Sequence, residues 1–189
     1  MKYPLCTYGH PILRKKAEPI GSIDLGLSAL ARDMLEVMTL SKGIGLAAQQ
    51  IGKTISICVI NFDSAFDVEE EGGTRLNPQV PLPLVMVNPE IVEKKGTWTD
   101  REGCLSVPDI WAPVQRAYEI SVHFVNLEGK SQDLSVQGFL ARVIQHELDH
   151  LGGVLFVDRM SPVKKITLSG KLKKLKIKTE EAWGLKSAE

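Results

Sequence analysis

The segment QHELDHLGG, residues 145–153, constrains the fold of this chain more than any other feature. His146 and His150 are four residues apart, about one helical turn, so on a helix both imidazoles lie on one face and can bind one metal ion. Glu147, between them, could accept a proton from a water molecule at that ion. Alternatively, backbone or carboxylate groups bond both histidines on a helix surface and Glu147 is simply solvated. The spacing favours a metal site on a helix.

Catalytic sites of this kind have three protein ligands and one position open for water, so the third ligand decides the reaction class. A third histidine, as in the metzincin proteases, is excluded because position 156 is Phe156. The downstream glutamates lie in a polar tail and are poor candidates for a thermolysin-like ligand. Upstream, REGCLSVP, residues 101–108, contains Cys104 after a glycine and before a proline-terminated extended stretch. This cysteine could complete a His2Cys site, although a lone cysteine between Gly and Leu is also typical of inert packing.

A third segment, GIGLAAQQIG, residues 43–52, is rich in glycine and alanine, which allow the backbone to approach a ligand closely. Gln50 in this segment could donate hydrogen bonds from its side-chain amide. A tight connection in which the small residues serve only packing would explain the same composition. Taken alone, the segment does not choose between these two interpretations.

The periodicity of the chain predicts an α+β fold with mainly antiparallel β-sheet. Apolar residues recur at helical spacing from Leu27 to Leu40, and the nearly continuous apolar stretch at 55–62 indicates a buried strand in which Cys58 fills the core. Strand character resumes at 84–94, and an alternating pattern predicts a hairpin over residues 118–137. One helix therefore precedes the strands, and the helix with the two histidines follows them.

The histidine-bearing helix is expected to be central and partly buried, to be capped by Ser135, and to end at Gly152 or Gly153. Residues 63–83 are acidic and then rich in Gly and Pro, which predicts a surface loop. Residues 163–189 form a basic tail that contains KLKKLKIK, and a C-terminal helix is expected there. The apolar residues around the histidines are Phe139, Leu140, Val143, Ile144 and Leu151.

Length and composition predict one domain over residues 1–189, because no break in composition suggests a second. Lys and Arg together number 23, as do Asp and Glu, so the net charge is zero. The chain therefore has no overall positive potential that would attract DNA or an anionic membrane surface. No stretch approaches the roughly 18 apolar residues of a membrane span, and the N-terminal residues contain no apolar signal core. Three cysteines, an odd number, fit a reducing compartment, and a cytoplasmic location is expected.

Together, GIGLAAQQ, EGCLS and QHELDH, in this order and at these separations, closely resemble the three signature motifs of the peptide deformylases. The resemblance extends from about Leu5 to Arg159, and the three motifs are jointly specific where each alone is not. It implies the peptide deformylase fold and a metal-dependent hydrolase. Such an enzyme would remove the formyl group from the N-terminal formyl-methionine of nascent polypeptides and release formate. The expected setting is bacterial-type translation, in the cytoplasm or an organelle matrix.

The resemblance also implies a ligand set in which Cys104, His146 and His150 bind one divalent metal ion. In this family the native ion is usually Fe²⁺, and Zn²⁺, Ni²⁺ or Co²⁺ is often present in purified protein. A thiolate and two imidazoles are compatible with iron and with zinc, so ligand softness alone does not choose between them.

Further roles follow from the same resemblance. Glu147 would act as general base and then general acid. Gln50 and the backbone N–H of Leu105 would stabilise the negative charge that builds on the substrate oxygen. The residues expected to contact the substrate, through backbone groups near the formyl-bearing end and along the peptide, are Ile44, Gly45 and Gly103.

Two other functions remain as alternatives. An aminopeptidase or another zincin-like protease built on the same helix would cleave unformylated peptide bonds and would not depend on Cys104. A non-catalytic metal-binding module would have a closed site with no exchangeable water. Glu147 and Gln50 argue against the second alternative.

Charged residues near the motifs lead to three further expectations. Glu102 and Arg116 are expected either to form an ion pair that holds the GCLS segment or to be unrelated surface charges. Arg142, one turn before His146, is expected to place a charge near the rim of the substrate pocket. The basic tail could contact an anionic surface, such as ribosomal RNA near emerging chains, or it could be a helix that merely packs on the domain.

Overall fold

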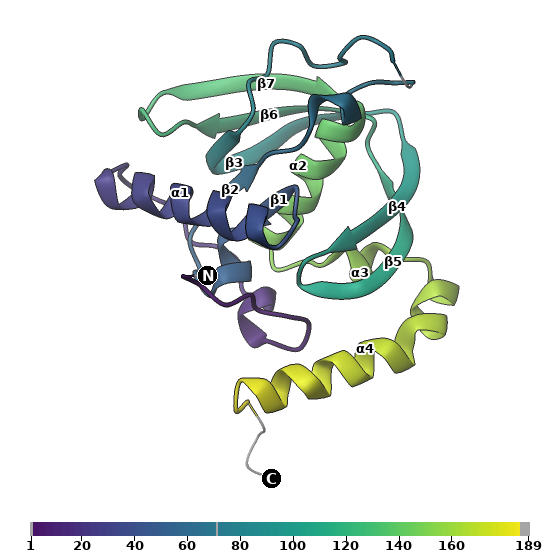
Figure 1. Ribbon diagram of the computed structural model, residues 1–189. Helices are drawn as coiled ribbons and strands as arrows, with labels where there is room; N and C mark the ends of the chain where they lie inside the picture. Colours follow the sequence, from purple (N-terminus) through teal and green to yellow (C-terminus); the bar gives the residue numbers. More distant parts are fainter. Residues whose placement is uncertain (1, 71, 186–189) are drawn as a thin grey trace.

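The computed structural model describes residues 2–70 and 72–185, and within them seven strands form two antiparallel sheets (Figure 1). The larger sheet has the strand order β1-β2-β3-β6-β7, and the smaller one consists of β4 and β5. The strands are β1 (Gly45–Ala47), β2 (Ile57–Ile60), β3 (Leu84–Lys95), β4 (Trp98–Cys104), β5 (Val107–Arg116), β6 (Glu119–Val125) and β7 (Ser131–Gln137). The helices are α1 (Leu25–Leu40), α2 (Gly138–Leu151), α3 (Phe156–Arg159) and α4 (Pro162–Ala182). This arrangement confirms the predicted α+β fold.

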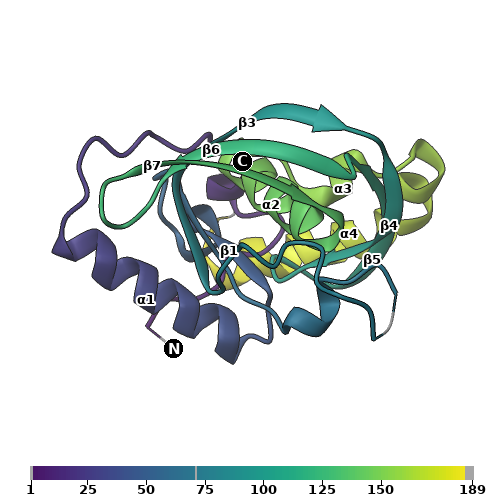
Figure 2. The ribbon, with the colours of Figure 1, turned by 90° about the horizontal axis from the view of Figure 1, so that it is seen from above.

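Strands β1 and β2 are buried between α1 and α2, as Figure 2 shows for β1. Successive side chains of a strand point to opposite faces of a sheet. Along β2, Ile57 and Val59 accordingly pack with the residues of α1, whereas Cys58 and Ile60 pack with those of α2. Covered faces on both sides explain why this strand is apolar without alternation. Cys58 is fully buried, as predicted.

Helix α1 begins two residues before the predicted start because Asp24 caps it. The Oδ1 atom of Asp24 accepts a hydrogen bond from the backbone N–H of Leu27 at 2.7 Å. An aspartate at this position satisfies one of the free N–H groups of the first turn. The residues that α1 buries against the sheet are Leu27, Ala31, Met34, Val37 and Met38.

Helix α2 begins at Gly138, and the predicted cap at Ser135 is wrong. Gln137 is the N-cap residue, and no side chain bonds to the first turn. Ser135 instead belongs to β7, where its Oγ lies 2.9 Å from Oγ of Ser121 on β6. The strand therefore runs directly into the helix. At the other end, Gly152 is the C-cap residue, in agreement with the prediction.

The hairpin formed by β4 and β5 was not anticipated, since the sequence suggested only an extended stretch ending at a proline. Its register pairs Glu102 with Ala112 and Cys104 with Val107, with an irregularity between these two pairs. A bulge of this kind bends a strand and redirects its side chains. Leu105 and Ser106 form the turn, so Cys104 lies at the tip of the hairpin beside α2.

The predicted surface loop at 63–83 is an ordered connection built around a buried carboxylate. Asp67 is fully buried and accepts hydrogen bonds from the side chains of Arg75 and Asn77. Asn77 also donates to the carbonyl of Gln137 at 3.0 Å, which ties the connection to the start of α2. Residue 71 of this segment lies outside the described residues.

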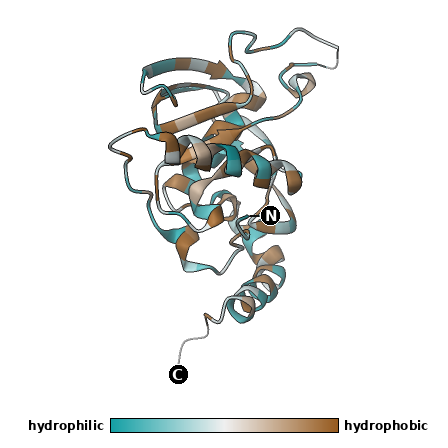
Figure 3. Cartoon of the chain, turned by 60° about the vertical axis from the view of Figure 1, so that its left-hand side comes forward, coloured by the Kyte–Doolittle hydropathy of each residue, from teal (hydrophilic) through white to brown (hydrophobic). Residues whose placement is uncertain are grey.

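The predicted basic tail contains helix α4, which projects away from the sheets at the bottom of Figure 1. Hydrophilic and hydrophobic residues are mixed along it (Figure 3). Leu172 is buried, and the hydroxyl groups of Thr179 and Thr7 lie 2.7 Å apart, so α4 is docked on the N-terminal segment. Residues 186–189 of the tail lie outside the described residues. Within the described part of the chain, none of the helices combines the length and apolar character that crossing a membrane requires.

Candidate metal centre

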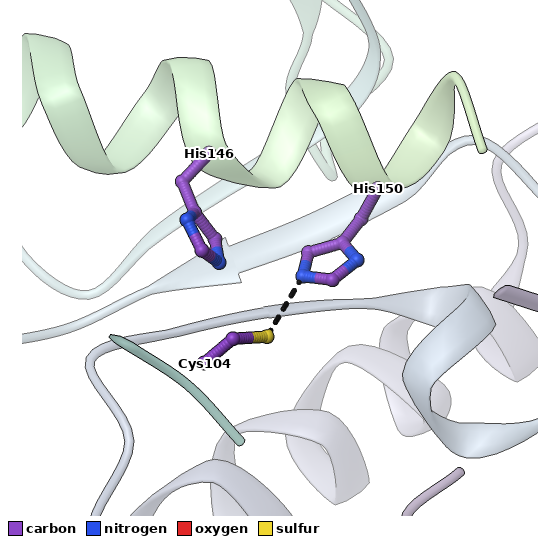
Figure 4. Close-up of side chains that lie close together, drawn as sticks. All are labelled: Cys104, His146 and His150. Atoms are coloured by element: carbon purple, nitrogen blue, oxygen red, sulfur yellow. Dashed lines mark hydrogen bonds between the residues drawn. The ribbon is translucent and has the colours of Figure 1, made fainter. Parts of the chain in front are cut away.

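Three side chains from two elements meet at the face of α2 that is turned toward the hairpin. The ligand-type atoms of Cys104, His146 and His150 all lie within 4.8 Å of one another. Figure 4 shows both imidazoles pointing from α2 toward the sulfur of Cys104, which lies 3.1 Å from Nε2 of His150. The helical spacing aligns the two histidines, as expected, and the bulge before the hairpin turn supplies the third donor.

The two histidines have opposite electrostatic environments. Burial lowers the pKa of His150 well below its usual range, so its imidazole is neutral and has a free lone pair. Burial would lower the pKa of His146 too, but hydrogen bonds with Cys104 and Glu102 raise it well above its usual range. His146 thus donates a proton from Nδ1 to Glu102 and another toward Cys104, and a bound cation would take the place of the second proton.

Glu102 is the partner that orients His146. Its Oε2 lies 3.1 Å from Nδ1 of His146, which leaves the Nε2 atom of the ring turned to the site. The carboxylate also accepts two hydrogen bonds from Arg116, both 2.9 Å long, and one from Arg142 at 2.6 Å. Burial would raise the pKa of Glu102, but the hydrogen bonds and charges of Arg116 and His146 lower it to about 2. The predicted Glu102–Arg116 ion pair is confirmed, and it is buried rather than on the surface.

Arg142 lines the cavity next to the ligand cluster, as expected, but its charge is paired rather than free. Its side chain is buried, and its guanidinium bonds to Glu102 and to the carbonyl groups of Trp98 and Val114 at 2.7 and 3.0 Å. The guanidinium carbon lies 4.4 Å from the centre of the Trp98 ring. Arg142 therefore joins α2 to both strands of the hairpin and balances the charge of Glu102.

Glu147 lies on the same helix with its carboxylate buried beside Gly45. A Cβ atom at position 45 would come within 2.2 Å of Oε1 of Glu147, so only glycine leaves room for this carboxylate. Among the described residues, the Oε2 atom has no hydrogen-bond partner. Burial raises the pKa of Glu147 to about 7, although the nearby charges of His146 and Arg116 oppose the shift. A buried carboxyl without a partner is suited to exchange a proton with a bound molecule.

Gln50 turns its amide nitrogen toward the same point. The backbone N–H of Ala47 donates to Oε1 of Gln50 at 2.8 Å, which fixes the orientation of the amide. Its Nε2 atom lies 3.6 Å from the sulfur of Cys104 and 3.2 Å from Oγ of Ser106. A fixed donor beside the ligand cluster could bind a developing negative charge.

These groups open into one cavity of about 660 Å³ between α2, the hairpin and the segment before β1. Phe139, Val143 and Trp111, which the sequence did not mark as functional, form part of its apolar wall. Only their positions next to the motifs in the folded chain reveal this role. His150, at the far side of the ligand cluster, is the one predicted site residue that does not line the cavity. The other predicted site residues all line it: Ile44, Gly45, Gln50, Gly103, Cys104, Leu105, His146 and Glu147.

Comparison with known proteins identifies the architecture. The family model described as polypeptide deformylase matches residues 2–166. The chain belongs to this family. It is 44% identical over 167 residues to a peptide deformylase from Nitrosococcus oceani, covering 88% of this chain and 92% of the relative. A second relative, from Syntrophobacter fumaroxidans, is 40% identical over 170 residues, covering 90% of this chain and 93% of that one.

Solved deformylase structures have the same fold. The crystal structure of a plant peptide deformylase superposes with a TM-score of 0.84 at 34% identity and covers 99% of this chain and 96% of its own. The enzyme from Thermus thermophilus gives a TM-score of 0.79 at 35% identity, with 94% and 99% covered. As a member of this family, the chain is a hydrolase that removes the N-formyl group from nascent peptides.

Proposed function

We propose that Cys104, His146 and His150 bind one divalent metal ion and that Glu147 transfers the protons in the hydrolysis of N-formyl-methionyl peptides. The observation that carries this proposal is the meeting of three soft and borderline donors within 4.8 Å, next to the buried carboxylate of Glu147, one oxygen of which has no hydrogen-bond partner in the described chain. One thiolate and two neutral imidazoles suit Fe²⁺ and Zn²⁺. We infer that Fe²⁺ is the native ion and that Zn²⁺, Ni²⁺ or Co²⁺ can replace it.

A divalent ion in this site would lower the pKa of a water molecule toward about 7 and so supply a nucleophile near neutral pH. With such an ion bound, Glu147 would accept a proton from the water molecule that attacks the formyl carbon. The amide of Gln50 and the backbone N–H of Leu105 donate to the carbonyl oxygen, whose negative charge grows in the transition state; each such donor is typically worth about 3 kcal/mol. Glu147 then gives the proton to the leaving amine. The C–N bond breaks, and formate and a free N-terminus result.

The substrate peptide would lie between two free strand edges. β1 is the edge strand of the larger sheet, and β4 pairs only with β5 among the described strands. An extended peptide can add to such edges through main-chain hydrogen bonds. The Ile44 carbonyl already accepts a bond from the N–H of Asn61 at 3.0 Å, so the pairing on that side uses its second lone pair and the adjoining edge at Gly45. Gly103 provides the opposite edge.

The site should reject acyl groups larger than formyl. Formyl carries only hydrogen on its carbonyl carbon, whereas acetyl adds a methyl group where Gly45 and Glu147 are already in close contact. Small misplacements of the reacting carbon cost much of the rate. We therefore expect acetyl-Met peptides to react far more slowly than formyl-Met peptides, while replacing Met by norleucine changes only the deeper apolar pocket and has little effect.

Substitution of each ligand tests the proposed metal set. Cys104→Ala, His146→Ala and His150→Ala should each lose metal and activity together, as measured by metal analysis of anaerobically prepared protein and by formate release. Cys58→Ala, at a buried cysteine outside the cavity, is the matched control and should retain the metal. Stoichiometric metal in Cys104→Ala would contradict the His2Cys site and favour a zincin-like protease. A metal-replete enzyme without formate release would instead favour a non-catalytic metal-binding module.

We also propose that the enzyme works in the cytoplasm on nascent chains and that α4 makes a transient contact with the ribosome. Lys171, Lys173 and Lys174 are exposed on this helix, and a basic surface can bind ribosomal RNA in a salt-dependent way. Because Leu172 and Thr179 are buried, deleting the helix would disturb the domain, so charge reversal is the better test.

Replacing those three lysines by Glu should weaken sedimentation with ribosomes at low salt. The matched control reverses three exposed lysines elsewhere, at positions 16, 94 and 130. Equal effects of the two triple variants, or binding that is insensitive to salt, would contradict the contact.

A further inference from the structure

Two exposed cations lie at the mouth of the catalytic cavity. Lys42 is two residues before Ile44, and Arg101 is two residues before Gly103; both line the cavity. Lys42 lies in the turn that precedes β1, and Arg101 lies on β4, so the two cations flank the edges between which the substrate would lie. Neither residue has a part in the proposed chemistry.

Both charges are uncompensated within the described part of the chain. Neither the Lys42 ammonium nor the Arg101 guanidinium forms an ion pair or a hydrogen bond there; only the backbone of Arg101 is bonded, in the β4–β5 pairing and to Asp100. The other charged residues of the cavity differ in this respect. Arg142 is paired with Glu102, and Glu147 is buried.

One exposed carboxylate, Asp109, also lines the cavity, so the rim carries two free cations against one anion. Asp109 belongs to β5, close to the turn of the hairpin. Lys42 and Arg101 lie instead on the two chain segments that lead up to the substrate edges. A negatively charged substrate side chain between these segments would face both cations.

The direction of the two edges places the substrate relative to these cations. The turn at Lys42 leads to Gly45 beside Glu147, and Arg101 on β4 leads to Cys104, so both segments run toward the ligand cluster. A peptide whose formyl end lies at the cluster must run the opposite way along both. Two strand residues span about 6.6 Å, so Arg101, two residues before Gly103 on β4, is level with the second or third residue of the substrate. Lys42, in the turn after α1, lines the same cavity from the other side.

We propose that Lys42 and Arg101 give the enzyme a preference for substrates with an acidic side chain at the second or third position after formyl-methionine. This inference rests on the proposed function and specifies the substrate class of the same site. The attraction acts across a solvated opening, so it is modest and is screened by salt. This attraction strengthens binding of the peptide before the chemical step, so its effect is seen mainly in kcat/KM.

The test compares C-terminally amidated formyl-Met tripeptides that carry Glu, Gln or Lys at position two or three. With the metal-replete enzyme at low salt, we expect kcat/KM for the Glu peptide to exceed that for the Lys peptide by about fivefold at one or both positions. The ratio should approach one at high salt. The double variant Lys42→Glu/Arg101→Glu should reverse the order, whereas Lys130→Glu, in the remote β6–β7 turn, should leave it unchanged.

The outcomes separate this inference from the proposed function. If the metal-replete enzyme does not deformylate the uncharged Gln peptide, the proposed function itself is wrong. If the Gln peptide is deformylated but the Glu and Lys peptides react at equal rates at low salt, the two cations do not select the substrate. A preference that persists in the double variant would also contradict the inference.

Discussion

The Nδ1 atom of His146 lies 3.1 Å from Oε2 of Glu102, and this bond links the metal centre to a buried charge cluster. Glu102, on β4, is held by Arg116 on β5 and by Arg142 on α2, so two other elements fix its carboxylate. A partner of this kind sets the orientation of a ligating histidine. The hairpin and α2 therefore position the imidazole that we propose as a metal ligand.

Replacing Glu102 by Gln should weaken both metal binding and folding. Metal affinity should fall by about 10–100-fold because His146 loses its anionic partner. The free energy of unfolding should fall by about 3–5 kcal/mol because Arg142 is left buried without a counter-charge and Arg116 keeps only its pair with Asp149. Competition with a chelator and denaturant unfolding measure the two effects. Glu93→Gln, at an exposed carboxylate paired with Lys95, is the control and should change neither.

The same carboxylate should contribute to acid unfolding. Its pKa is lowered to about 2, below the usual value of 4.5, so its ion pairs stabilise the fold fully above about pH 4.5. This stabilisation is lost as the pH falls through about 2. The stability of the wild-type protein should therefore decrease between these two pH values more steeply than that of Glu102→Gln. Parallel curves for the two proteins would show that Glu102 is not the titrating group.

Gly45→Ala should leave the metal bound and lower turnover by about 100-fold or more. The added Cβ would lie 2.2 Å from Oε1 of Glu147, so the carboxylate must move away from its place beside the ligands. Gly170→Ala is the control, because nothing lies within 4 Å of the position where its Cβ would be. On helix α4 that substitution should have no effect on turnover and should slightly stabilise the helix. Wild-type turnover in Gly45→Ala would contradict the placement of Glu147.

Glu147→Gln separates metal binding from proton transfer. The amide occupies the same space but cannot accept a proton from water, and such transfer commonly contributes about 10²–10⁴-fold to the rate. We expect full metal content and a rate reduced by that factor. A metal-replete variant with a near-normal rate would remove Glu147 from the chemistry.

The motifs allowed much of the site to be predicted from the sequence, because helical spacing alone aligns His146 and His150. The supporting contacts could be found only in part: the Glu102–Arg116 pair was predicted, whereas the bonds from Glu102 to His146 and Arg142 were not. Glu102 and Arg142 are 40 residues apart in the chain, and only the folded hairpin brings them into contact. Arg142 was expected at the rim, because an arginine is seldom buried unless several partners bond to its guanidinium.

Sequence patterns also predicted only some of the strands and helix ends. Strand β2 was predicted because a continuous apolar stretch is visible in the local sequence, without knowledge of the neighbouring strands. The hairpin of β4 and β5 was not, because β4 is mostly polar and exposed and its bulge interrupts the alternation. Ser135 was taken for a helix cap because serine is common there, yet β7 continues through it to Gln137.

The most direct test of the account is to identify the products that the metal-replete enzyme forms from a formyl-Met-Ala-Ser peptide. Mass spectrometry and a formate assay should detect formate and the intact peptide with a free N-terminus in equal amounts, and neither product with Cys104→Ala. Cleavage of the Met–Ala bond, or formation of both products by Cys104→Ala, would contradict a deformylase that acts through this metal centre.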